Sequence, residues 1–72
     1  MKNSKIVVIN NIREFRKNLG LTQFDLGNLI GVSDEAISSY ECGLYNPSLI
    51  TVCSLLKLFD CKFEELFQVW SV

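Results

Sequence analysis

LTQFDLGNLIGVSDEAISSYECG, residues 21–43, is the stretch that decides the fold. The Thr22 hydroxyl can accept a hydrogen bond from a free amide at a helix start, and Asp25 follows three residues later, as in a capping box. Gly31 can adopt the left-handed conformation that ends a helix, and Ser33 can cap the next helix almost at once. The stretch therefore predicts two short helices that meet at a sharp corner.

A pair of helices joined by three or four residues, with a glycine in the turn, is a helix-turn-helix, whose second helix can enter the major groove of DNA. That second helix is predicted from a Ser33 cap to about Cys42, and three of its side chains are expected to face inward: Ala36, Ile37 and Tyr40. The outward side chains form the candidate face for reading bases: Asp34, Glu35, Ser38 and Ser39, with Cys42 near the end.

Length and composition allow one small domain. The chain has 72 residues, of which 49% are hydrophobic, and a domain of this size buries only about 60% of the surface that its unfolded chain exposes. No apolar run approaches the roughly 20 residues that span a bilayer, and polar residues interrupt the N-terminal stretch too early for a secretion signal. We therefore expect a cytoplasmic protein without a membrane partner.

The residue types argue against catalysis and against a metal site. The three cysteines show no C-x-x-C spacing and the chain has no histidine, so we expect reduced thiols, with Cys53 and Cys61 in the core and Cys42 exposed. We find no glycine-rich phosphate loop, no carboxylate pair in a predicted cleft and no general base for a serine nucleophile. We therefore expect no enzyme activity, cofactor, metal or small-molecule ligand.

Charge argues against tight nucleic-acid binding. Seven Lys and Arg against eight Asp and Glu give a net charge of -1 and a pI near 5.2, whereas phosphate neutralisation supplies much of the affinity for DNA. The distribution is uneven, because five cations lie in the first 17 residues: Lys2, Lys5, Arg13, Arg16 and Lys17.

One further helix precedes the corner, before residue 21. Asn10 or Asn11 can cap this helix, which Gly20 ends, and its predicted buried face is Ile12, Phe15 and Leu19. Arg16 lies beside that face, so it is expected to be partly buried and to need an acidic partner. In the helix from Thr22 to Gly31 the predicted buried stripe is Leu26, Leu29 and Ile30. Gly27 indicates close approach of another backbone segment, and Phe24 falls off the stripe as an exposed aromatic residue.

The fourth predicted helix follows a Ser48 cap and carries more apolar surface than one buried stripe uses. Its expected core face is Leu49, Val52, Leu55, Leu56 and Phe59, and further apolar residues lie around it: Ile50, Cys53 and Leu58. Such a helix is buried by its own domain or shared with a second subunit. After a break at 60–62, a fifth helix is marked by Phe63, Leu66 and Phe67, and its apolar character continues through Val69 and Trp70.

The two ends carry β-branched and aromatic runs, KIVVI at 5–9 and FQVWSV at 67–72. One hypothesis pairs them as strands, within one chain or between two chains. The alternative is that both are loosely ordered ends.

The elements L-T-Q, G-V-S, I-S, Y-E-x-G and N-P-S-L, in this order between residues 11 and 67, resemble the Cro and lambda-repressor-like helix-turn-helix family, also called the XRE family. The resemblance implies an all-α fold, a compact five-helix domain to which the ends can add short strands. It also implies one domain over 1–72, with an N-terminal arm or strand in 1–10, the five-helix core in 11–67 and a C-terminal tail in 68–72.

The resemblance also implies roles for individual positions. Arg16 and Glu41 match a structural ion pair between the first helix and the end of the third. Contacts to the DNA backbone are expected from Thr22, Gln23, Ser33, Asn46, Arg13 and Lys17. Base contacts are expected from Asp34, Glu35, Ser38 and Ser39. The candidate dimer interface is Ile50, Cys53, Phe67, Val69 and Trp70.

One departure from the family pattern concerns Asp34 and Glu35, where family members usually carry Gln, Arg or Thr. A carboxylate is repelled by phosphate, although it can accept a hydrogen bond from the cytosine amino group. Acids in a first turn also stabilise the helix by roughly 0.3 to 1 kcal/mol. For Asp34 helix-start stabilisation ranks first, and for Glu35 the two roles are even.

Two functions remain at this point. The leading hypothesis is a sequence-specific regulator that binds double-stranded DNA, acting as a homodimeric repressor on a near-palindromic operator. The alternative is a helix-turn-helix fold used for protein recognition, as an accessory or antitoxin-like partner, through the acidic third helix and three exposed apolar residues, Phe24, Leu44 and Tyr45.

Overall fold

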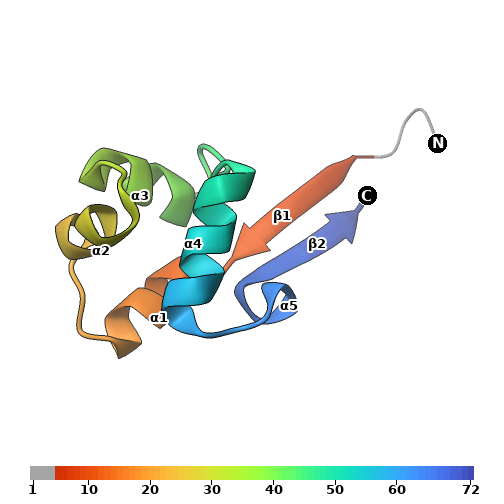
Figure 1. Cartoon of the computed structure of the whole chain (residues 1–72). Coiled ribbons are helices and arrows are strands. Elements are labelled where there is room, and N and C mark those ends of the chain that lie inside the picture. Colours follow the sequence, from red (N-terminus) through yellow and green to blue (C-terminus); the bar gives the residue numbers. More distant parts are fainter. Residues whose placement is uncertain (1–4) are drawn as a thin grey trace.

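The computed structural model of the chain describes residues 5–72, which form five helices and two strands. In chain order the elements are β1 (Ile6–Asn10), α1 (Ile12–Asn18), α2 (Gln23–Ile30), α3 (Asp34–Glu41), α4 (Leu49–Phe59), α5 (Phe63–Leu66) and β2 (Phe67–Ser71). In Figure 1, α2 and α3 lie at one end of the molecule and the paired strands project from the other end. The fold is therefore mostly helical, as the family resemblance implies. Lys2, part of the basic N-terminal group, lies outside the described residues.

The corner between α2 and α3 has the predicted capping. Thr22 Oγ1 accepts the Asp25 N–H at 3.0 Å, and the Asp25 carboxylate accepts the Thr22 N–H at 3.0 Å, so the capping box is complete. Gly31 has a φ of 79°, in the left-handed region. Ser33 Oγ then accepts the Ala36 N–H at 3.1 Å and starts α3. Local capping chemistry thus sets the geometry of the helix-turn-helix.

Gly27 allows the turn between α2 and α3 to pass close to α2. A Cβ atom at this buried position would lie 2.5 Å from the carbonyl oxygen of Val32. Only glycine fits there without moving the backbone, so the prediction of close approach is confirmed.

Each helix supplies one completely buried side chain to the core. These side chains are Ile12, Leu26, Ile37, Leu55 and Leu66, each with an exposed fraction of 0%, and Phe67 from β2 joins them with 4%. Burying a side chain of this kind stabilises the fold by about 1.5 to 3 kcal/mol. The core therefore ties together all five helices and the first residue of β2.

Some residues predicted to be buried are exposed. Leu19, Leu29 and Leu49 have exposed fractions of 52%, 58% and 78%, and Cys53 is also exposed. Leu19 follows the last residue of α1 and Leu49 is the first residue of α4, where the helix ends reach past the core. The core of so short a chain covers only a narrow side of each helix.

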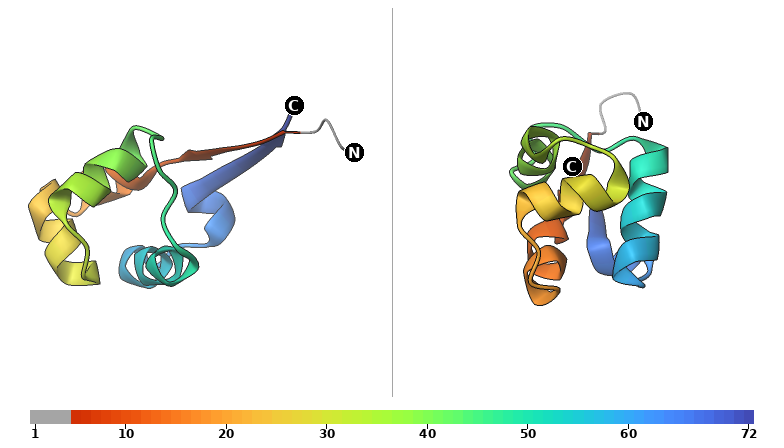
Figure 2. Two further views of the ribbon diagram at one scale, coloured as in Figure 1. Left: turned by 90° about the horizontal axis from the view of Figure 1, so that it is seen from above. Right: turned by 60° about the vertical axis from the view of Figure 1, so that its left-hand side comes forward.

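The two ends of the described chain pair as antiparallel strands within one molecule. The register runs from Ile6 opposite Ser71 to Asn10 opposite Phe67. Figure 2 shows β1 and β2 running side by side away from the helices. Of the alternatives, pairing within one chain is confirmed, and loosely ordered ends are wrong for residues 5–10 and 67–72. The helix predicted through Phe67 ends at Leu66, because the chain turns there into β2.

Asn10 joins this pair of strands to the helices. Its Oδ1 accepts the Ile12 N–H, the first amide of α1, at 3.1 Å, and its Nδ2 donates to the carbonyl oxygen of Tyr40 at 2.9 Å. The strands are therefore anchored to the end of α3 at their inner end. The N-cap residue Asn11 makes no side-chain cap hydrogen bond. No helix in the described part of the chain has the length and apolar character needed to cross a membrane.

Candidate functional site

Helix α3 presents a polar face to solvent. Asp34, Glu35 and Ser38 are exposed and Ser39 is half-buried, whereas Ile37 on the opposite side is completely buried. Because the buried residue fixes the rotation of α3 about its own axis, the four polar side chains are available to a partner outside the molecule.

Of the polar side chains at the start of α3, some form hydrogen bonds within the protein and one does not. Ser33 Oγ is engaged with the Ala36 N–H, and Asp34 Oδ1 accepts the Glu35 N–H at 3.0 Å. Asp34 thus stabilises the helix start, the role that ranked first for it. No hydrogen bond to another side chain or to the backbone involves the carboxylate of Glu35 within residues 5–72.

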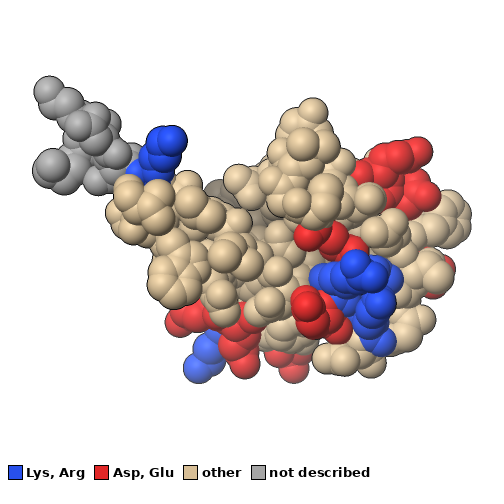
Figure 3. Space-filling model, turned by 180° about the vertical axis from the view of Figure 1, so that it is seen from behind, with Lys and Arg blue, Asp and Glu red and all other residues tan. Residues whose placement is uncertain are grey.

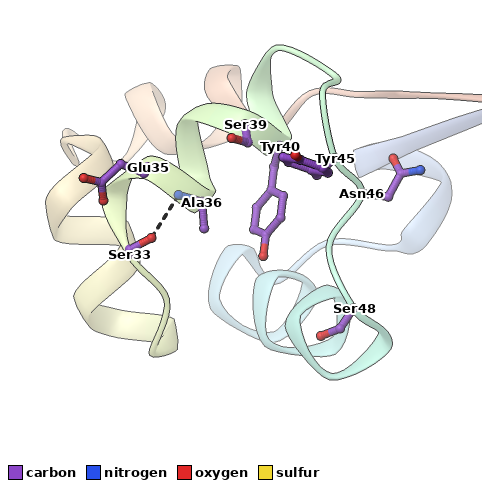
Figure 4. Close-up of a pocket in the computed structure, with 8 residues that line it drawn as sticks. All are labelled: Ser33, Glu35, Ala36, Ser39, Tyr40, Tyr45, Asn46 and Ser48. Atoms are coloured by element: carbon purple, nitrogen blue, oxygen red, sulfur yellow. Dashed lines mark hydrogen bonds between the residues drawn. The ribbon is translucent and has the colours of Figure 1, made fainter.

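A shallow groove of about 500 Å³ runs between α3 and the loop that follows it. Figure 4 shows side chains from both elements along it, with the Tyr40 hydroxyl directed toward α4. The groove is lined by Ser33, Glu35, Ala36, Ser39, Tyr40, Tyr45, Asn46 and Ser48. It therefore joins two positions expected to contact bases, Glu35 and Ser39, with two expected to contact phosphate, Ser33 and Asn46.

The loop from α3 to α4 is held against the end of α3. The carbonyl oxygen of Ser39 accepts the Leu44 N–H at 2.9 Å, and Gly43, with a φ of 78°, donates to the carbonyl oxygen of Tyr40 at 3.1 Å. Ser48 Oγ then caps α4 by accepting the Thr51 N–H at 3.3 Å. These bonds set the path of the loop that carries the exposed Asn46 beside α3.

The structure brings Arg16 and Glu41 together in a buried ion pair. Arg16 donates from Nε to Glu41 Oε2 at 2.6 Å and from a terminal nitrogen to Oε1 at 3.1 Å. Another Arg16 nitrogen donates to the carbonyl oxygen of Leu21 at 2.8 Å. The bidentate geometry ties α1 to the end of α3 and to the segment before α2.

Gln23 belongs to the same network, which the sequence patterns did not reveal. Its Nε2 donates to Glu41 Oε1 at 3.1 Å, across 18 positions in the chain. Burial works against the charge of Glu41, but hydrogen bonds from Arg16 and Gln23 outweigh burial and lower the pKa of this carboxyl. Gln23 is therefore oriented by a charged partner at the start of α2.

The remaining basic residues of α1, Arg13 and Lys17, are exposed. Arg13 is close enough to Glu41 to contribute to the lowering of its pKa. Figure 3 shows, on the face seen from behind, blue basic side chains directly beside red acidic ones, with most of the surface uncharged. That face therefore carries no extended basic surface.

The five candidate dimer residues lie on α4 and β2, and the prediction is wrong for Phe67. Ile50 and Cys53 are exposed on α4, and Val69 and Trp70 are more than half exposed on β2. Phe67 is only 4% exposed. Its ring belongs to the core, where it stacks on Phe63 with ring centroids 5.0 Å apart, so it is not free to contact a second subunit.

Comparison with known proteins gives a consistent result. A family model described as Helix-turn-helix matches residues 12–66. A protein from Methanothermobacter thermautotrophicus, described as an uncharacterized HTH-type transcriptional regulator, is 54% identical over 57 residues, which cover 78% of this chain and 83% of that protein. A protein of the same description from Archaeoglobus fulgidus is 43% identical over 56 residues, 78% of this chain and 80% of that one.

Among solved structures, the P22 c2 repressor protein in complex with the synthetic operator 9T resembles the fold with a TM-score of 0.68. The two sequences are 37% identical, and the match covers 71% of this chain and 77% of the repressor chain. The similarity therefore spans the helical part that carries the corner and α3.

Proposed function

Because the chain belongs to the Cro and lambda-repressor-like (XRE-type) helix-turn-helix family, we propose that it is a cytoplasmic transcriptional regulator that binds double-stranded DNA sequence-specifically. It acts as a homodimeric repressor on a near-palindromic operator and performs no catalysis. The observation that carries the proposal is the exposed polar face of α3, which the corner at Gly31 and the buried Ile37 hold outward at one end of the molecule. A helix presented in this way fits the major groove.

Contacts to the phosphate backbone come from the rims of this face. Thr22 and Gln23 stand at the start of α2, where backbone amides without a helical partner favour phosphate. Ser33 and Asn46 lie at the two ends of the groove beside α3. Such contacts set the register of the protein on DNA, and base contacts from α3 supply the specificity.

The charge of the domain predicts weak binding by one copy. Arg13 and Lys17 are the exposed cations of α1, and the first turn of α3 adds two carboxylates. If each of these two cations neutralises one phosphate in each of two subunits, four phosphates are neutralised. The slope of log affinity against log salt concentration is then about −3.6. Raising salt from about 50 to 200 mM then lowers the affinity about 150-fold.

A second copy compensates for weak binding by one copy, and exposed apolar residues at the two ends of the chain support this part of the proposal. The terminal arm, formed by β1 and β2, exposes Ile6, Val7, Val69 and Trp70 at fractions between 41% and 63%. It projects from the end of the molecule opposite α3 (Figure 1). Pairing of two copies through the arm leaves both α3 helices free, so that each can read one half-site of the operator. These side chains lie on both faces of the arm, with Val7 and Trp70 on one face and Ile6 and Val69 on the other, and exposed apolar surface is typical of interaction sites.

The test is an unbiased selection of DNA sequences by the purified protein over a salt series. We expect a palindromic motif whose affinity falls with salt as calculated above, and repression of a promoter that carries the motif in a reporter strain. Gln23→Ala should weaken binding to all sequences alike, whereas Asn28→Ala, on the exposed side of α2, should not. If no DNA sequence were enriched even at low salt, the proposal would be overturned, and recognition of a protein partner would be the remaining function.

Dimerisation has its own measurement. Trp70→Lys should shift the protein from dimer toward monomer in sedimentation equilibrium and weaken operator binding. Phe24→Lys, at a side chain 61% exposed on α2, is the matched control for the sedimentation measurement because it places the same charge away from the arm. A monomeric unmodified protein at micromolar concentration would contradict the homodimer.

A further inference from the structure

The first turn of α3 contains two carboxylates, and the structure gives them different roles. Asp34 Oδ1 accepts the Glu35 N–H at 3.0 Å, so one oxygen of this carboxylate is held against the helix start. Ser33 Oγ is likewise occupied by the Ala36 N–H. Glu35 is exposed, and within residues 5–72 neither a hydrogen bond nor an ion pair involves its carboxylate. Its acceptor oxygens are therefore available to a ligand.

Glu35 also stands where base edges are contacted. It is the second residue of α3, and the N-terminal residues of a recognition helix approach the bases. Its side chain lines the same groove as Ser39 and Asn46 (Figure 4). A carboxylate on this face is repelled by the phosphates unless it meets a hydrogen-bond donor on a base.

The four bases differ in what they offer a carboxylate in the major groove. Guanine presents the acceptors N7 and O6, and thymine presents the acceptor O4 and a methyl group. Adenine presents its N6 amino group directly beside the acceptor N7, which repels the second carboxylate oxygen. Cytosine presents the N4 amino donor, and it is the usual base partner of Glu and Asp.

On these grounds, and resting on the proposed DNA-binding function, we infer that Glu35 is the residue that selects cytosine at one position of each operator half-site. Asp34 does not contribute to this selection. The carboxylate of Glu35 accepts from the cytosine amino group. Guanine and thymine at that position present no amino donor, and adenine places the acceptor N7 beside its amino donor. The acidic start of α3 thus supplies specificity and lowers general affinity for DNA.

The experiment compares Glu35→Gln with Asp34→Asn in the same DNA selection, followed by binding to operators with each base at each position. Both substitutions remove one negative charge from the same helical turn. Asn keeps an oxygen that can accept the Glu35 N–H, so Asp34→Asn is a matched control for charge. Circular dichroism and thermal melting establish that each variant is folded.

We expect the unmodified protein to prefer cytosine at one symmetric position by about fivefold or more. Glu35→Gln should lose that preference and gain adenine, because Gln pairs with adenine N6 and N7. Asp34→Asn should keep cytosine, and both variants should bind unrelated DNA more tightly at low salt. A motif that Glu35→Gln leaves unchanged, or that Asp34→Asn changes in the same way, would overturn the inference while the proposed function stands. Failure of the unmodified protein to select any motif would overturn both.

Discussion

Replacing Arg16 by Met tests how strongly the buried ion pair holds α1, α2 and α3 together. Arg16 is 8% exposed and the Glu41 side chain 6%, so Arg16→Met leaves a carboxylate without its cation in a nearly closed environment. Removing one partner of a buried pair costs about 3 to 5 kcal/mol. Met keeps much of the packing and Gln23 still donates to Glu41, so we expect the low end, about 3 kcal/mol.

That loss is large for a domain of this size. At roughly 0.05 to 0.15 kcal/mol per residue, the whole chain has a free energy of unfolding of about 4 to 11 kcal/mol. Equilibrium unfolding in urea at pH 7, followed by circular dichroism, should therefore show a much lower midpoint with an unchanged slope.

The same variant has a predicted pH dependence. The folded-state pKa of Glu41 is below its ordinary value of 4.5, so the stability that its charge contributes is fully present above about pH 4.5 and is lost as the pH falls through the folded-state pKa. In Arg16→Met, burial without the guanidinium should raise the pKa of Glu41. Protonation of Glu41 at lower pH then removes the unpaired charge and restores part of the lost stability. The stability difference between the two proteins should therefore shrink between pH 7 and pH 4.

A double variant separates the charge from the packing. Arg16→Met combined with Glu41→Leu removes the unpaired charge, so it should recover most of the loss, since apolar residues can replace a buried pair. The reasoning would be refuted if Arg16→Met lost less than about 1 kcal/mol, or if the double variant were no more stable than the single one.

Three other predictions follow from packing and burial. Gly27→Ala places a Cβ against a main-chain oxygen of the corner and should cost about 1 to 3 kcal/mol, whereas Asn28→Ala should be close to neutral in the same urea titration. Phe67→Ala should lower the free energy of unfolding by about 3 to 5 kcal/mol, and a near-neutral result would show that the ring is not in the core. In alkylation followed by mass spectrometry, exposed Cys53 should react faster than half-buried Cys61, because burial raises the pKa of the Cys61 thiol.

Much of the helix-turn-helix could be predicted because its determinants are local. The caps at Thr22, Ser33 and Ser48 depend on residues three positions away, and the left-handed turn depends on Gly31 itself. Such interactions can be recognised along the chain without knowing the tertiary structure. The need of Arg16 for an acid was predictable in the same way, from its position beside an apolar face.

Burial could be predicted only in part. The spacing of apolar residues indicates which side of a helix faces inward, but it does not say how far the neighbouring elements extend. Leu49 and Ile50 are both 78% exposed because α4 begins beyond the core. Phe67 was predicted at a helix end and in a dimer interface, but it is buried as the first residue of β2. It pairs there with Asn10 from the other end of the chain, and this long-range pairing cannot be read from local spacing.

The sequence by itself determined the caps, the corner, the outward face of α3 and the charge imbalance, because each depends on residue types at short spacing. Only the tertiary structure decided that the two ends pair within one chain, that Gln23 joins Arg16 on Glu41, and that Asp34 bonds to the backbone at the helix start while Glu35 does not. The pairing and the Gln23 contact join residues far apart in the chain, and the difference between the two acids depends on side-chain rotamers. Long-range contacts and rotamers produce no periodic pattern in the sequence, so they could be identified only from the folded structure.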